Sequence, residues 1–160
     1  MKKQDNKLKI LFLCTGNSCR SQMAEGWTRH LKNDVIEAYS AGIEEHGLNP
    51  YAVAVMEEAG VDISGYTSKT VDEVTEKEFD YVITVCGHAD RNCPVFPGDA
   101  RVVHAEFDDP PALAEKAETE EEVLSIYRKV RDEIYGLIAK LPGVLLHMES
   151  IRPSIKKEDV

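Results

Sequence analysis

The sequence contains no apolar run that approaches membrane-spanning length, which would need about 20 residues. Residues 1–9 are polar and charged and do not include the apolar core of a secretory signal. We therefore expect a cytoplasmic protein with no membrane partner.

Positive charge is scarce, with 19 Lys and Arg against 29 Asp and Glu and a net charge of −10. Nucleic acid and anionic membranes would be repelled by this excess of negative charge, so neither is an expected partner. Any anion-binding site must therefore gather positive charge locally.

Cysteine and histidine are few, at four and five residues. In the cytoplasm the four thiols are reduced by default, which favours catalytic, redox or metal-binding roles over structural disulfides. The histidines are scattered and form no convincing ligand cluster, so we expect no metal and no bound cofactor.

The chain has no internal repeat, and its 160 residues suit one domain. We expect this domain over residues 1–148, followed by a flexible tail over 149–160. A monomer is expected.

Apolar segments of two kinds alternate along the chain. Strands are predicted over residues 9–13, 35–39, 79–85 and 101–105. Helices are predicted from Arg20 to before Asn33, from Pro50 to Gly60 with Asn49 as the N-cap, over a short segment after Thr70, and over 118–141. This alternation predicts an α/β fold with a four-stranded parallel sheet and right-handed crossovers.

The first predicted strand ends at Cys14 in a small polar turn that leads into a helix. A helix N-terminus with converging N–H groups is an anion site. Its expected substrate-binding residues are Thr15, Gly16, Asn17, Ser18, Cys19, Arg20 and Ser21.

Three side chains in this turn suit chemistry on a phosphate-like oxyanion. The helix dipole, the N–H groups and a guanidinium favour the thiolate form of Cys14, which would be a nucleophile. Arg20 offers a planar fork of donors to two oxygens, and Ser21 could donate to the sulfur. The alternative is that Cys14 is only a small buried residue at a strand end.

Two later cysteines, Cys86 and Cys93, follow the third predicted strand. If the first and third strands are neighbours, Cys86 could meet Cys14 at the carboxyl edge of the sheet. One interpretation is a relay in which Cys86 attacks the sulfur of Cys14 and Cys93 then attacks Cys86. The alternatives are packing roles, or a zinc site made by Cys86, His88 and Cys93 with His104.

The Cys14-x5-Arg20-Ser21 pattern resembles the signature of the low-molecular-weight protein tyrosine phosphatase superfamily. With Cys86 and Cys93, the resemblance narrows to its thioredoxin-coupled arsenate reductases. Further matching stretches are 22–27, 39–43, 46–50 and 107–110. The resemblance implies the phosphatase-like fold, a three-layer sandwich with the sheet in the middle.

The resemblance also implies a catalytic sequence that starts with attack of Cys14 on arsenate. Asp109, immediately before Pro110, would act as the general acid, although the adjacent Asp108 and Asp109 also suit an ordinary turn. Cys86 would then release arsenite, Cys93 would resolve the disulfide, and thioredoxin would reduce the Cys86–Cys93 bond.

Some family members bind a potassium ion behind the loop. The matching positions here are Asn17, Glu25, Ser40 and, in place of an expected aspartate, Lys69. We expect these four residues to support the loop, with the Lys69 ammonium replacing the ion and pairing with Glu25.

Two other functions are compatible with the loop. A phosphotyrosine phosphatase would use the same Cys14, Arg20 and Asp109, but such enzymes carry aromatic residues after the acid where this chain has Pro110, Pro111, Ala112 and Leu113. A non-catalytic oxyanion sensor or thiol switch would be oxidised stoichiometrically without turnover.

Overall fold

The computed structural model describes residues 7–74, 77–85 and 100–147. Cys86, His88, Cys93 and the predicted tail over 149–160 lie outside these residues. Within them, no helix has the length and apolar character needed to cross a membrane.

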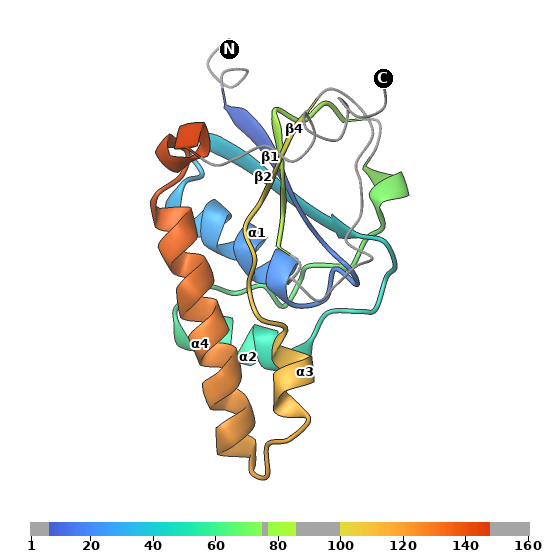
Figure 1. Cartoon of the computed structure of the whole chain (residues 1–160), viewed down its shortest axis with the longest axis vertical. Coiled ribbons are helices and arrows are strands. Elements are labelled where there is room, and N and C mark those ends of the chain that lie inside the picture. The colour runs from blue at the N-terminus through green and yellow to red at the C-terminus, as the bar shows by residue number, and fades with distance from the viewer. Residues whose placement is uncertain (1–6, 75–76, 86–99, 148–160) are drawn as a thin grey trace.

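A four-stranded parallel sheet forms the centre of the fold, in the order β2-β1-β3-β4. The strands are β1 (Leu8–Cys14), β2 (Ile36–Gly42), β3 (Tyr81–Thr84) and β4 (Arg101–His104). The helices are α1 (Arg20–Leu31), α2 (Pro50–Glu58), α3 (Pro110–Ala114) and α4 (Glu120–Ala139), with 3₁₀ turns η2 (Val71–Glu73) and η3 (Gly143–His147). The predicted α/β fold is confirmed (Figure 1).

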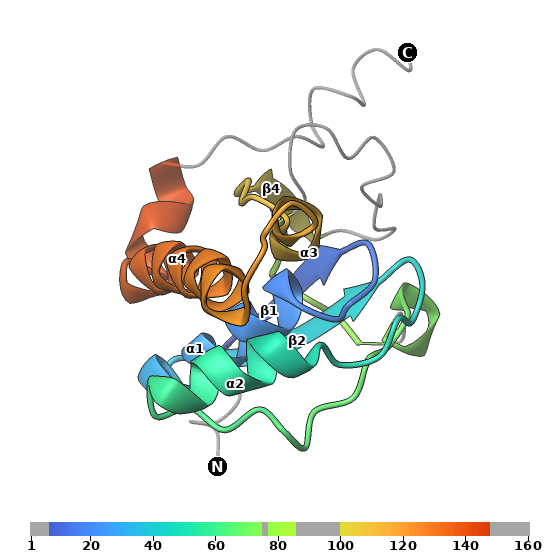
Figure 2. The same ribbon diagram turned by 90° about the horizontal axis from the view of Figure 1, so that it is seen from below.

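The two faces of the sheet bury different residues because side chains alternate along each strand. On one face, Ile10 and Phe12 of β1 join a core with α1, α2 and α4. Figure 2 shows these three helices grouped together. On the other face, Leu11 and Leu13 pack with residues around η2, including Val74. The sheet is therefore the middle layer.

The helix starts follow local signals in the sequence. The Asn49 side chain accepts hydrogen bonds from the backbone N–H groups of Tyr51 and Ala52, and Pro50 begins α2. The hydroxyl of Thr119 caps α4 in the same way. The predicted extents of α2 and α4 are each one or two residues too long at their ends, where helices fray.

The strands β1 and β3 are neighbours, and their pairing continues to the carboxyl end of the sheet. Leu13 pairs with Thr84, and Val85 N donates to Leu13 O at 2.9 Å. The prediction that the first and third strands are neighbours is confirmed. As a result, the loop after Cys14, the last residues of β3 and the segment after β4 meet at the carboxyl end of the sheet.

Candidate active site

The loop between β1 and α1 surrounds a cavity of about 280 Å³. This volume is near the lower end of the roughly 300–1,000 Å³ typical of ligand pockets and leaves room for a small ion. Its lining is formed by Cys14, Thr15, Gly16, Ser18, Cys19, Arg20, His46, Asp109 and Pro111.

The loop carbonyls are held by neighbouring segments. These bonds are Ile43 N and Glu44 N to Thr15 O (2.9 and 3.0 Å), His46 N and Ser68 Oγ to Gly16 O (3.1 and 3.0 Å), and Asn49 N to Ser18 O (3.0 Å). Because C=O and N–H point in opposite directions across a trans peptide, carbonyls that bond outward turn the following N–H groups towards the inside of the loop. Such an array can bind an oxyanion.

Cys14 lies at the base of the cavity and is almost fully buried. Its Sγ is 3.0 Å from Ser21 Oγ, and Asn17 Nδ2 donates to the same oxygen at 2.9 Å. Since the hydroxyl accepts from Asn17, its one proton is available to the sulfur. The Ser21 hydroxyl is therefore placed to donate a hydrogen bond to the nucleophilic sulfur.

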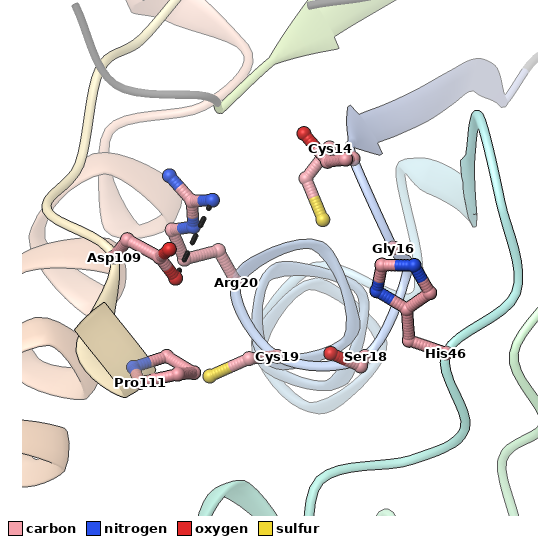
Figure 3. A pocket seen from close by; sticks show the side chains of 9 residues that line it. Cys14, Gly16, Ser18, Cys19, Arg20, His46, Asp109 and Pro111 are labelled. Carbon is pink, nitrogen blue, oxygen red and sulfur yellow. Dashed lines mark ion pairs between the residues drawn. The ribbon is translucent and has the colours of Figure 1, made fainter. Parts of the chain in front are cut away.

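Arg20 begins α1 and connects the loop to residues that follow β3 and β4. Its Nη1 donates to Val85 O at 3.3 Å and to Phe107 O at 3.1 Å. Its Nη2 lies 3.6 Å from Asp109 Oδ1. Figure 3 shows Arg20 and Asp109 on one side of the cavity. The structure thus brings Cys14, Arg20 and Asp109, separated by up to 95 positions in the sequence, to one pocket.

Asp109 is the N-terminal flanking residue of α3, but its side chain makes no capping hydrogen bond. About half of its side chain is exposed. The carboxyl group therefore lines the cavity beside Arg20, where it can face a ligand.

Cys19 lines the same cavity, with its sulfur directed towards Pro111 in Figure 3. Burial raises the pKa of the Cys19 thiol, and the nearby Cys14 raises it further. Cys19 is therefore a neutral packing residue under ordinary conditions.

Gln22 is a buried support of the loop that sequence reasoning missed. Its Nε2 donates to Asn17 O at 3.0 Å, Asn17 Oδ1 at 3.2 Å and Thr67 O at 3.0 Å. Asn17 has a left-handed backbone with φ of 49°, which these bonds hold in place. The signal that could have identified it is a polar side chain directly after the loop residues, in the first turn of the predicted helix.

The predicted Lys69–Glu25 ion pair is wrong. Lys69 Nζ donates to Thr67 O at 2.9 Å, while Glu25 accepts from Ser40 Oγ at 2.6 Å and pairs with Arg29 at 2.8 Å. Arg29 lies one helical turn after Glu25 on α1, so it reaches the carboxylate without crossing to another segment. Lys69 touches the loop through its backbone N–H, which donates to Asn17 Oδ1 at 2.6 Å.

This arrangement does not fit a potassium ion at the four matching positions. The Glu25 carboxylate is already neutralised by Arg29, and Asn17 Oδ1 already accepts from Lys69 N and Gln22 Nε2. Among the described residues, no group of three or more His, Cys, Asp or Glu could hold a metal ion.

The parallel sheet and the Cys14-x5-Arg20 loop with an aspartate beside it define a cysteine-based oxyanion site of the phosphatase type. Residues 9–150 match the family model described as low molecular weight phosphotyrosine protein phosphatase, and the chain belongs to this family.

Within the family, the chain is similar to arsenate reductases. It is 53% identical over 129 residues to the "Arsenate reductase" of Halalkalibacterium halodurans, covering 81% of this chain and 91% of that protein. Among solved structures, "an arsenate reductase in the phosphate binding state" has a TM-score of 0.64 and 34% identity, covering 84% of this chain and 98% of that one. A thioredoxin-dependent arsenate reductase of Corynebacterium glutamicum has a TM-score of 0.55 and 27% identity, covering 82% of this chain and 60% of that one.

Proposed function

We propose that this protein reduces arsenate to arsenite in the cytoplasm. The observation that carries the proposal is that Cys14, Arg20 and Asp109 line one small cavity. The chain is also about half identical to proteins named arsenate reductase. Arsenate is a tetrahedral oxyanion, which the loop N–H groups and the Arg20 guanidinium can bind.

In the first step, the Cys14 thiolate attacks arsenic and forms a sulfur–arsenic bond. Asp109 protonates the departing oxygen, which leaves as water. Ser21 stabilises the thiolate before attack, and Arg20 holds two oxygens of the substrate.

In the second step, the Cys86 thiolate attacks Cys14 Sγ. The electron pair of the sulfur–arsenic bond passes to arsenic, which leaves as As(III) in arsenite, and a Cys14–Cys86 disulfide remains. Both cysteine sulfurs are oxidised by one electron each while arsenic gains two. Support for this step comes from the sequence, because Cys86 directly follows Val85, which is hydrogen-bonded to Leu13 beside Cys14.

Cys93 then attacks Cys86, freeing Cys14 and leaving a Cys86–Cys93 disulfide. A dithiol protein of the thioredoxin type reduces this bond and is itself oxidised to a disulfide. The name of the Corynebacterium glutamicum relative supports this donor.

The first experiment is disulfide mapping by peptide mass spectrometry on fully reduced protein, before and after arsenate, with phosphate as control. Arsenate-dependent formation of a Cys86–Cys93 bond with release of arsenite is expected. Cys93→Ser should trap the Cys14–Cys86 bond, and Cys86→Ser should prevent net turnover. Thiols that arsenate leaves unchanged would contradict the proposal, and hydrolysis of an aryl phosphate by the same sample would assign the site to a phosphatase.

A further inference from the structure

His46 lies on the wall of the oxyanion cavity, although it is 26 positions after Arg20 in the sequence. Its backbone N–H donates to Gly16 O at 3.1 Å, which fastens its segment to the loop. Figure 3 shows the imidazole on the side of the cavity opposite Arg20 and Asp109. A ligand in the cavity would therefore lie between His46 and Arg20.

Gly16 is the reason that the ring can lie so close to the loop. A Cβ atom on Gly16 would stand 2.3 Å from His46 Nδ1 and 2.7 Å from Cγ, far inside van der Waals contact. Because glycine has no side chain, the imidazole packs directly on the loop backbone.

Glu44 orients the ring from the other side. Its Oε1 lies 2.6 Å from His46 Nε2, and an ionised carboxylate can only accept, so Nε2 carries the proton. This bond holds the imidazole in place on the wall of the cavity.

The charges around the cavity leave room for a second cation beside Arg20. Arg20 is already opposed by Asp109, and Cys14 as a thiolate adds a negative charge to the base. Of the described residues that line the cavity, His46 is the other side chain able to become a cation. The remaining titratable group there is the Cys19 thiol, and Glu45, next to His46 in the sequence, bonds to Glu73.

We propose that His46 is a second oxyanion-binding residue, which takes up a proton from solvent when a dianion binds and holds that dianion opposite Arg20. The inference deepens the proposed function, since it names a substrate-recognition residue for the same cavity. It predicts that His46 controls the affinity for substrate and phosphate more than the rate of the chemical steps.

The test is isothermal titration calorimetry with inorganic sulfate and phosphate, in two buffers of different ionisation enthalpy. A Cys14→Ser background removes proton exchange at the nucleophile, and sulfate has no titrating proton of its own near neutral pH. The background protein should take up protons on binding sulfate. Adding His46→Gln should reduce that uptake and weaken binding of both anions about tenfold, the value of one charge-assisted hydrogen bond. His147→Gln, at an exposed histidine of η3, is the matched control and should change neither quantity.

With Cys14 intact, His46→Gln should raise KM for arsenate about tenfold and leave kcat within about twofold. Unchanged affinity and unchanged proton uptake would overturn the inference. If circular dichroism shows that His46→Gln is not folded, Glu44→Gln is used instead. Reduced proton uptake in Glu44→Gln supports the inference, and unchanged uptake overturns it. If the wild-type enzyme reduces no arsenate, the proposed function is contradicted and this inference is not. If the enzyme reduces arsenate and His46→Gln leaves KM unchanged, only this inference is contradicted.

Discussion

Ser21 Oγ lies 3.0 Å from Cys14 Sγ while accepting a hydrogen bond from Asn17 Nδ2 at 2.9 Å. A hydroxyl that accepts from Asn17 keeps its one proton, which it can donate to the sulfur of a Cys14 thiolate. Asn17 is held in turn by Gln22 and by Lys69 N. The state of the nucleophile thus depends on side chains that do not line the cavity.

Ser21→Ala should lower the rate of the first chemical step by about 10- to 100-fold, because a hydrogen bond to a charged group contributes about 1.5–3 kcal/mol. Single-turnover kinetics of arsenite release would measure it. Ser64→Ala is the control, since this exposed hydroxyl donates to Asp62, two residues away in the chain. Equal rates in Ser21→Ala and wild type would contradict the role of the hydroxyl.

Asp109→Asn should reduce kcat by about 100-fold or more, the usual contribution of a general acid. Asp108→Asn should stay within about twofold of wild type, because Asp109 lines the cavity beside Arg20 and Asp108 does not. Steady-state kinetics of both variants would decide the assignment. The opposite ranking would move the acid to Asp108.

Gly42→Ala should destabilise the protein by about 1–3 kcal/mol. A Cβ on Gly42 would lie 2.7 Å from Asn17 N and Thr15 O and 2.9 Å from Cys14 O, and these backbone atoms cannot move without distorting the loop. Gly136→Ala, in α4 with open space around it, should instead stabilise by about 0.5–1 kcal/mol. Urea denaturation would compare the two, and a neutral Gly42→Ala would show that the loop can yield.

Iodoacetamide should modify Cys14 well before Cys19 between pH 7 and 9. The thiolate is the reactive form, and burial raises the pKa of Cys19, so this residue stays a thiol as the pH rises through that range. Peptide mass spectrometry over time would measure both sites, with phosphate expected to protect Cys14. Modification of Cys19 at the same rate would contradict the raised pKa of its thiol.

Exchange of sodium for potassium should change arsenate turnover by less than about twofold, because the salt bridge from Arg29 already neutralises Glu25. Turnover in matched chloride buffers would measure it, with choline chloride as a third arm at equal ionic strength. A clear dependence on potassium would show that the ion competes with Arg29 for the carboxylate.

Several features could be predicted from the sequence because their causes are local. The apolar run of β1, the Asn49–Pro50 start of α2 and the periodic face of α4 each lie within one short segment. Helix α3 was missed, since Pro110 and Pro111 favour a turn as well as the first turn of a helix. The relation of Cys86 and Cys93 to Cys14 stays a prediction, because both lie outside the described residues.

The sequence by itself determined the nucleophilic loop, because Cys14, Arg20 and Ser21 lie within eight consecutive positions at the end of a strand and their chemistry needs only that local turn. Only the tertiary structure decided which distant groups complete it. The parallel sheet brings Asp109 to Arg20, and hydrogen bonds from residues 43–49 to the loop carbonyls bring His46 to the cavity. Those choices depend on distances between segments far apart in the chain, which residue types and local spacing do not specify.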